Sequence, residues 1–225
     1  MTSNAARLRS RENGGLSVHN GAVDQEVLKL LKGRIRRDDP PRVLVISDTH
    51  FDHESRIHRY RRPFGSVAEM NRAMLGRWNA AVREEDTVCF GGDLVAGQAS
   101  RGSAYWLERL NGNIIFIEGN KDKDAPEGAK GFHTVKVGGR EFYMVHDPAH
   151  APADLGEGVW IIYGHKHNLS HFPFVNGRAR MINMSADVIG FRPVPLDAIA
   201  ALPLERIMVW PTINDKPEMF EARRR

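Results

Sequence analysis

The sequence predicts an α/β fold in which buried strands alternate with helices. Five apolar segments, each four to six residues long, are rich in β-branched and aromatic types and do not alternate with polar residues. Such segments are typical of strands that are covered on both faces of a sheet. Helix-like segments separate the first three of them, which predicts βαβ units. The five segments are residues 43–47, 87–92, 114–119, 142–145 and 160–164.

Two helices are expected between the first three strands. Residues 66–82 begin with a capping-box pair, Ser66 and Glu69, and carry an apolar stripe at helical spacing. Residues 103–110 predict a shorter helix, which ends at Asn111-Gly112. Each helix would carry the chain back to the start of a parallel neighbouring strand.

We expect one domain after a polar tail. At 225 residues the chain is long enough for one substantial core. Residues 1–22 are polar and lack periodicity, which predicts a loose tail, and residues 23–225 are expected to form a single domain. This domain would begin with a helix at 23–36, and its hairpin turns are expected at Gly138-Gly139 and Asn176-Gly177.

Composition and charge restrict the setting and the partners. No apolar run approaches the roughly 20 residues that span a bilayer, so no membrane partner is expected. The single cysteine, Cys89, cannot make an internal disulfide, and the N-terminus lacks an apolar signal region; both favour the cytoplasm. The formal charge is +4, with arginines gathered near both termini. Nucleic acid is therefore one partner to consider, although solvated termini explain the same charges more simply.

Each of the five predicted strands runs into a residue that can bind a metal ion. In a layered α/β sheet, ligands bind beyond the carboxyl ends of the strands, where the connecting loops converge. One such residue alone is weak evidence, because strand-end aspartates often cap helices and most histidines only form hydrogen bonds. All five strands ending this way points to a shared site. Its members are Asp48, His50, Asp93, Asn120, His146, His165 and His167.

The residue types indicate which metals suit this site. Carboxylate, amide oxygen and imidazole together suit Mn²⁺ first, with Fe, Zn²⁺ or Ni²⁺ as alternatives, and no thiolate is among them. Seven ligands exceed what one ion takes from protein but serve two ions if one carboxylate bridges. Two such ions can bind a phosphoryl group and stabilise its developing charge.

Five motifs resemble those of the calcineurin-like metallophosphoesterases. They occur in the family's order over about 120 residues. The resemblance is closest to small bacterial and phage members, which share Arg62-Pro63-Phe64 and an ending like NMSADVIGFRPV (183–194), and it then covers residues 42–196. The motifs are SDTHFDH (47–53), GGD (91–93), GNKD (119–122), VHDP (145–148) and GHKH (164–167).

The resemblance implies a four-layer αββα sandwich of two mixed β-sheets flanked by helices. It also implies a division of the ligands between two ions that share Asp93. One ion would be held by Asp48, His50, Asp93 and His167, and the other by Asp93, Asn120, His146 and His165. The reaction implied is hydrolysis of phosphomonoesters or phosphodiesters by in-line attack of a metal-bound hydroxide on a small phosphoester substrate.

One position departs from the family. Lys121 stands where a histidine usually follows the Gly-Asn pair. An ammonium with a pKa of about 10.4 is a poor proton donor, but it still offers charge to a phosphoryl oxygen. Asp122 is expected to orient this neighbouring catalytic side chain. His53, Arg62 and Asn120 are expected to face the substrate.

Two other functions fit the same motifs. A nuclease or a cyclic-phosphate RNA-end hydrolase would use the basic termini to hold nucleic acid. A non-catalytic interaction scaffold on the same fold would have lost metal chemistry, but every ligand type is present here and only Lys121 departs. Metal content and turnover of an aryl phosphate distinguish the scaffold from the enzyme, and salt-dependent oligonucleotide binding tests the nuclease.

Overall fold

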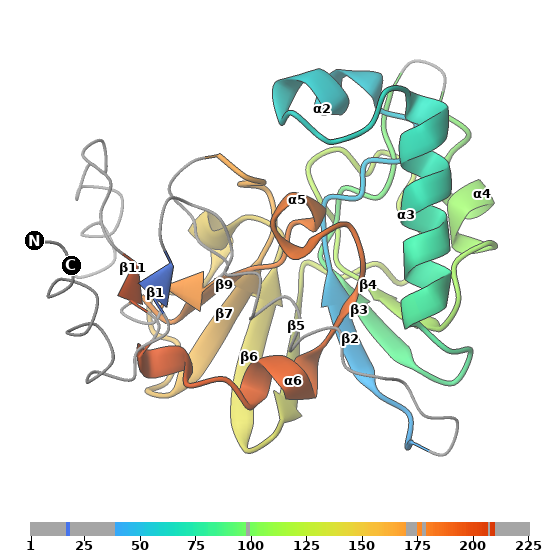
Figure 1. Cartoon of the computed structure of the whole chain (residues 1–225). Coiled ribbons are helices and arrows are strands. Elements are labelled where there is room, and N and C mark those ends of the chain that lie inside the picture. Colours follow the sequence, from blue (N-terminus) through green and yellow to red (C-terminus); the bar gives the residue numbers. More distant parts are fainter. Residues whose placement is uncertain are drawn as a thin grey trace, which may run out of the picture.

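A computed structural model describes residues 17–18, 39–97, 100–169, 175–176, 179–206 and 208–209 (Figure 1). The helix expected at 23–36 and most of the tail expected at 1–22 lie outside the described residues. Within that tail, β1 (Ser17–Val18) pairs in parallel with β11 (Met208–Val209), so these two residues are a strand and not loose chain.

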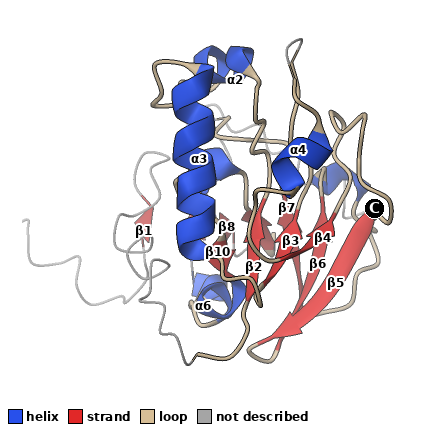
Figure 2. Cartoon of the chain, turned by 90° about the vertical axis from the view of Figure 1, so that its right-hand side faces the viewer, coloured by secondary structure: helices blue, strands red, loops and turns tan. Residues whose placement is uncertain are grey.

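The first sheet carries the βαβ units that the sequence predicts. Its strand order is β10-β2-β3-β4. The strands β2 (Val43–Ile46), β3 (Thr87–Phe90) and β4 (Asn113–Phe116) are parallel, and β10 (Val194–Pro195) joins β2 antiparallel. The connecting helices α3 (Val67–Ala81) and α4 (Ser103–Leu107) cover the outer face of this sheet (Figures 1 and 2).

The N-terminus of α3 shows why the chain turns into a helix there. The Ser66 hydroxyl accepts a hydrogen bond from the Glu69 N–H at 3.2 Å, as the capping box predicts. The Glu69 carboxylate bonds to the N–H of Gly65 rather than to that of Ser66. The predicted apolar stripe is the buried face of the helix and includes Met70, Met74 and Trp78.

The second sheet is also mixed, with the order β5-β6-β7-β9-β8. β5 (Phe132–Val137) and β6 (Arg140–Val145) form the hairpin predicted at Gly138-Gly139, where both glycines have positive φ. β7 (Val159–Tyr163) is parallel to β6 and to β9 (Met181–Asn183), and β8 (Val175–Asn176) closes the sheet antiparallel to β9.

One apolar core joins the two sheets, and a second, smaller cluster lies on the far face of the second sheet. Along β6, Phe142 and Met144 belong to the shared core, whereas Tyr143 and Val145 belong to the far cluster. Both faces are thus buried, which explains the absence of polar alternation. The predicted α/β class with two mixed sheets is confirmed.

Part of the layer beyond the second sheet belongs to the described residues. In the described part of the chain, the far cluster packs with Ala151 and Leu155 of the loop after a short 3-10 helix, η1 (Pro148–His150). Among the described residues, those that pack on this face outside the sheet are loop and 3-10 helix, and no α-helix contributes to the cluster.

Four short helices complete the described chain. α2 (Glu54–Arg59) and α5 (Ala186–Ile189) lie at the carboxyl end of β2, and α6 (Leu196–Ala200) lies at the opposite end (Figure 1). The 3-10 helix η2 (Leu204–Arg206) follows α6. Among the residues described, no helix has the length and apolar character needed to cross a membrane. The loops beyond the carboxyl ends of the strands are therefore framed by α2 and α5.

Candidate metal centre

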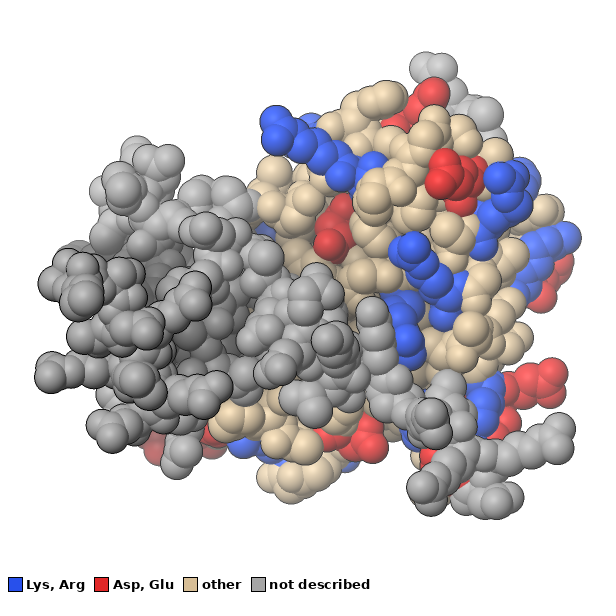
Figure 3. Space-filling model, viewed as in Figure 1, with Lys and Arg blue, Asp and Glu red and all other residues tan. Residues whose placement is uncertain are grey.

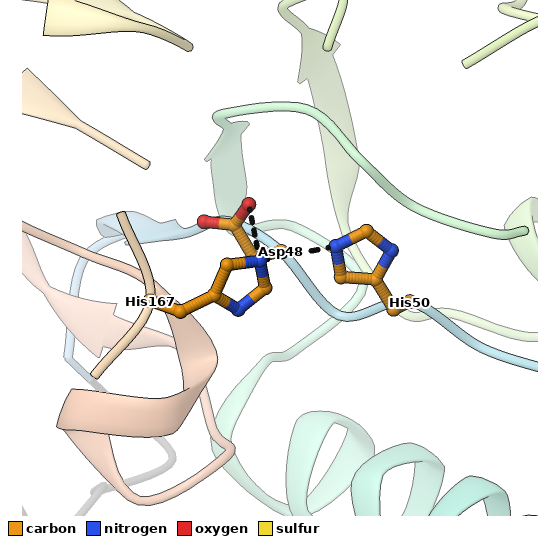
Figure 4. Close-up of side chains that lie close together, drawn as sticks. All are labelled: Asp48, His50 and His167. Carbon is orange, nitrogen blue, oxygen red and sulfur yellow. Dashed lines mark hydrogen bonds and ion pairs between the residues drawn. The ribbon is translucent and has the colours of Figure 1, made fainter. Parts of the chain in front are cut away.

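The seven predicted ligand residues come together beyond the carboxyl ends of both sheets. Asp48 and His50 follow β2, Asp93 follows β3, Asn120 follows β4, His146 follows β6, and His165 and His167 follow β7. Ligand atoms of Asp48, His50 and His167 all lie within 4.8 Å of one another (Figure 4). Ligand atoms of Asp48, Asp93 and His146 do so as well.

The backbone at this site is held in an unfavourable conformation. Five of the seven residues have φ between 49° and 68°, in the left-handed region that non-glycine residues seldom adopt. Such strain persists where surrounding structure enforces it, and it gathers at functional sites. Two backbone hydrogen bonds provide that enforcement here: the Asp48 N–H donates to Gly92 and the His50 N–H donates to Asp93. The five residues are Asp48, His50, Asp93, His165 and His167.

Two glycines let the motif loops approach closely. A Cβ on Gly119 would collide with the Asp93 carboxylate, and a Cβ on Gly164 would collide with Ser47. These contacts explain why the motif residues Asn120 and His165 each follow a glycine.

The half of the site around His167 is almost completely buried. The Nδ1 of His167 lies 2.7 Å from the carboxylate of Asp187, and the Tyr60 ring stacks on the imidazole at 3.7 Å between centroids. Because Nδ1 donates to Asp187, the Nε2 of the neutral ring carries a lone pair. That atom lies 3.3 Å from His50 Nε2 and 3.6 Å from an oxygen of Asp48.

The half around His146 is more open, and its histidine is oriented in the same way. The Nδ1 of His146 donates to the carbonyl of Gly91 at 2.8 Å, which leaves a lone pair on Nε2. Nε2 lies 3.2 Å from Asn120 Oδ1, 3.3 Å from His165 Nδ1 and 3.6 Å from Asp93 Oδ1. The side chain of His165 is 30 % exposed, whereas those of Asp48 and His50 are fully buried.

Asp93 lies between the two halves. Its Oδ1 faces His146, and its Oδ2 lies 3.3 Å from His50 Nε2. Burial raises the pKa of Asp93 to about 6, and the charge of Asp48 adds to the rise against the opposing effect of His146. Burying the ionised carboxylates of Asp48 and Asp93 close to each other costs free energy unless a cation neutralises their charge.

The donor set fits divalent cations. In the neutral tautomers that donate from Nδ1, the Nε2 lone pairs of His146 and His167 face carboxylate oxygens 3.6 Å away, so that acceptor faces acceptor. A cation between such atoms removes their repulsion. Imidazole mixed with carboxylate and amide oxygen, without thiolate, suits Mn²⁺, Fe or Zn²⁺.

Arg62, which the sequence predicts to bind substrate, lies buried among protein partners in this structure. Its side chain is fully buried, and its guanidinium donates to both oxygens of Asp187 at 2.9 Å. It also donates to the backbone carbonyls of Asp48 and Thr49. With its donors committed, Arg62 instead supports the loop that carries Asp48 and fixes Asp187 beside His167.

Asp122 also acts differently from the expectation. Its buried carboxylate accepts the backbone N–H groups of Asp93 at 2.7 Å, Leu94 at 2.8 Å and Gly119 at 2.8 Å. It therefore positions the loop that presents Asp93, and no described contact joins it to the side chain of Lys121. Burial raises the pKa of Asp122 in spite of these three hydrogen bonds.

The other predicted substrate residues lie at the open side. Asn120 and Lys121 are exposed, and the Lys121 N–H donates to Asp93 Oδ1 at 2.8 Å. His53 is half-buried, with its Nδ1 3.3 Å from His50 Nδ1. Burial lowers the pKa of His53 to about 4, and the charges of Arg56, Arg62 and Lys121 contribute to the lowering. Arg56 and Lys121 are thus both close enough to His53 to disfavour its protonated form.

Sequence reasoning missed three residues beside the centre: Asp187, Tyr60 and Arg56. Asp187 lies 20 residues after His167 in sequence and holds it with a hydrogen bond. Its pKa is lowered, because hydrogen bonds from His167 and Arg62 outweigh the effect of burial. The only signal for it was its place in the segment 183–194 that strengthens the family resemblance.

Comparison with known proteins decides the family. The model of the calcineurin-like phosphoesterase superfamily domain matches residues 42–184. This chain belongs to the calcineurin-like phosphoesterase superfamily. It is 40 % identical over 177 residues to uncharacterized protein MJ1445 of Methanocaldococcus jannaschii, which covers 77 % of this chain and 97 % of that protein. The family resemblance seen in the motifs is confirmed.

A solved structure supports the fold of this family member independently. The crystal structure of AQ665 of Aquifex aeolicus, a protein of unknown function, superposes with a TM-score of 0.54 at 20 % identity. The similarity covers 71 % of this chain and 98 % of that one. At this identity the likeness extends to the fold alone.

Proposed function

We propose that this chain is a dinuclear-metal-dependent phosphoesterase that hydrolyses small phosphomonoesters or phosphodiesters, with Mn²⁺ as the first candidate metal. The observation that carries the proposal is that a ring nitrogen of each of two histidines lies close to a carboxylate oxygen, both of them hydrogen-bond acceptors when the ring is neutral. His146 and His167 each use Nδ1 for a hydrogen bond and aim Nε2 at a carboxylate oxygen. This arrangement is costly without cations and suits the chemistry of the superfamily.

Asp93 is the proposed bridge between the two ions. Its two oxygens face different histidines, one in each half of the site. The first ion would take Asp48, His50, Asp93 and His167, and the second Asp93, Asn120, His146 and His165. Asp48 lies within reach of both halves, but its Oδ2 already accepts the hydroxyls of Ser47 and Ser185. Those two hydrogen bonds favour Asp48 as a terminal ligand.

The chain's own residues would orient substrate at the open side of the site. Two divalent cations, when bound, supply charge neutralisation for the phosphoryl group and a lowered pKa for water held between them. Lys121 would place a fixed positive charge beside the phosphoryl oxygens, and the exposed Asn120 and half-buried His53 would contact them from neighbouring loops. Asp122 holds Asp93 in position through the backbone. The buried free thiol of Cys89 fits the cytoplasmic location that we propose.

The test compares turnover with and without metal on a panel of phosphoesters. The panel contains bis(4-nitrophenyl) phosphate, 4-nitrophenyl phosphate, cyclic nucleotides and oligonucleotides, each with Mn²⁺ and with a chelator. His146→Gln should lower Mn²⁺-dependent turnover by at least about 100-fold, since even residues behind the ligands contribute 10- to 100-fold. His133→Gln is the matched control, because His133 lies on the neighbouring strand β5, paired with Met144 of β6.

Three results would contradict the proposal. These are turnover that a chelator leaves unchanged, turnover that His146→Gln leaves unchanged, and no turnover of any panel member with Mn²⁺, Fe, Zn²⁺ or Ni²⁺. The last result favours the scaffold. Activity restricted to oligonucleotides and steeply dependent on salt favours the nuclease.

A further inference from the structure

Arg56 is a buried cation with no anionic partner in the described chain. It is 9 % exposed, and its Nε lacks any hydrogen-bond partner there. Arg62, six residues later, is just as buried but has Asp187 and two carbonyls as partners. A buried guanidinium nitrogen without a hydrogen-bond partner is costly, and such a group calls for a specific explanation.

The position of Arg56 places this free charge beside the metal centre. Its Cζ lies 5.5 Å from the centroid of the Tyr60 ring, and that ring stacks on His167. The charge of Arg56 also acts on His50 and on His53. Arg56 belongs to α2, which Figure 1 shows beyond the carboxyl end of β2. The guanidinium therefore lies next to the ring that packs on His167, a residue of the metal centre.

Further basic side chains lie around Arg56. On the face in Figure 3, lysine and arginine side chains lie near α2 and α3, with acidic side chains among them. Arg59 and Arg72 are exposed members of these two helices.

We infer that Arg56 binds a second phosphate group of the substrate, next to the phosphoryl group at the metal centre. The inference rests on the proposed function and narrows its substrate class to phosphoesters that carry a further phosphate. A guanidinium matches phosphate because its planar fork presents paired N–H donors to two oxygens. The scissile group is assigned to the ions, and the second phosphate to Arg56, which neighbours the ligand residue His167 through the Tyr60 ring.

The experiment compares two ligands that differ by one phosphate. Thymidine 3′,5′-bisphosphate and thymidine 5′-monophosphate are titrated calorimetrically into the Mn²⁺-loaded protein at fixed ionic strength. The parent should bind the bisphosphate about tenfold more tightly, the effect of one charge-assisted hydrogen-bonding group. Arg56→Gln should reduce that ratio to less than about twofold. Because both ligands are measured on the same sample, partial unfolding of the variant cancels in the ratio.

Arg59→Gln is the matched control. Arg59 is on the same helix and lies 5.7 Å from the same Tyr60 ring, but it is exposed. This variant should keep the tenfold ratio, which excludes a general effect of charge. Equal binding of the two ligands by the parent, or an unchanged ratio in Arg56→Gln, would overturn the inference.

The design separates this inference from the proposed function, because binding needs no turnover. A preference that Arg56→Gln removes, in a protein without hydrolytic activity, supports the subsite and contradicts the hydrolase. Turnover without the preference supports the hydrolase and contradicts the subsite.

A third ligand, a 5′-phosphorylated tetrathymidylate, identifies the source of the second phosphate. If the tetrathymidylate binds more tightly than the bisphosphate and loses that advantage in Arg56→Gln, the second phosphate belongs to a nucleic-acid strand. Otherwise the second phosphate belongs to a small molecule.

Discussion

Asp86 and Asp93 are buried aspartates at opposite ends of the same strand, β3, and arginine side chains of the described chain bind only Asp86. Asp86, before the strand, is bound by the guanidiniums of Arg42 and Arg83 and by the backbone N–H of each. Asp93, after the strand, accepts the Lys121 N–H and otherwise faces His50 and His146. In the described part of the chain, no lysine or arginine side chain contacts Asp93.

The pKa values follow this difference. Although burial opposes it, hydrogen bonds from Arg42 and Arg83 hold the pKa of Asp86 well below its usual range. Burial raises the pKa of Asp93 to about 6. Within the described residues, arginines supply the counter-charge at one end of β3, and no lysine or arginine does so at the other. A charge that folding leaves unbalanced beside histidine lone pairs is the mark of a site that a cation completes.

The largest effect is expected from removing the charge of Asp93. Asp93→Asn should lower turnover by about a thousandfold, because the bridging charge serves both ions and each contributes several kcal/mol to catalysis. Asp48→Asn should cost less, since that residue serves one ion. The measurement is turnover of bis(4-nitrophenyl) phosphate at saturating Mn²⁺. If Asp93→Asn keeps most of the activity, the bridge is assigned to the wrong aspartate.

At the other end of β3, the same substitution should affect stability and not the site. Asp86→Asn should lower the free energy of unfolding by about 3–5 kcal/mol, as removing one partner of a buried ion pair does. Urea unfolding of the metal-free protein measures this. Asp93→Asn should not destabilise the metal-free protein, because it removes a buried charge that has no counter-charge. Equal destabilisation by Asp86→Asn and Asp93→Asn would contradict the idea that only Asp86 is stabilised by ion pairs in the metal-free protein.

The free energy of unfolding measured at acid pH gives a second test of the role of Asp86. Its pKa is lower in the folded protein than in the unfolded chain, where it is about 3.9. The stabilisation is therefore complete above that value and is lost as pH falls towards the folded pKa. The unfolding free energies of parent and Asp86→Asn should converge below about pH 4.

The sequence predicted the metal-ligand residues better than the residues that hold them in position. Strand ends that carry Asp48, Asp93 and His146 are local features, and parallel strands bring their carboxyl ends together. The role of Arg62 could not be predicted, because its partner Asp187 is 125 residues away and only packing brings the two together. Sequence proximity to the first motif suggested a substrate role for Arg62, whereas Arg56 is the arginine beside the centre whose Nε lacks a partner in the described chain.

A smaller loss is expected from Lys121, the position that departs from the family. Lys121→Ala should lower turnover of poor alkyl leaving groups by about 100-fold, and that of nitrophenyl esters less, if its charge assists departure. Lys121→His should keep measurable activity and add a pH dependence near neutrality. Metal occupancy is matched by elemental analysis in each sample. Equal rates for Lys121→Ala and the parent on every substrate would show that the residue has no catalytic role.

The smallest effect is expected from changing Asp187, which holds the His167 ring by a hydrogen bond. Asp187→Asn should weaken Mn²⁺ binding at the buried half by about 10- to 100-fold, because the carboxylate orients the ring and raises its basicity. Calorimetric titration of Mn²⁺ measures the affinity, and ¹⁵N NMR of the His167 ring reports whether Nδ1 keeps its proton. The matched variant Asp197→Asn, on the exposed face of α6, should change neither. Unchanged affinity together with an unchanged tautomer would exclude a positioning role for Asp187.

The number and position of the metal ions bound at Asp93 test the dinuclear centre most directly. After reconstitution with Mn²⁺, elemental analysis should find two ions per chain, and anomalous scattering should place them on either side of the Asp93 carboxylate. The separation expected for such a pair is about 3.5–4 Å. Stable binding of a single ion, with His146 and His165 unliganded, would contradict both the dinuclear centre and the idea that metal ions supply the counter-charge that Asp93 lacks.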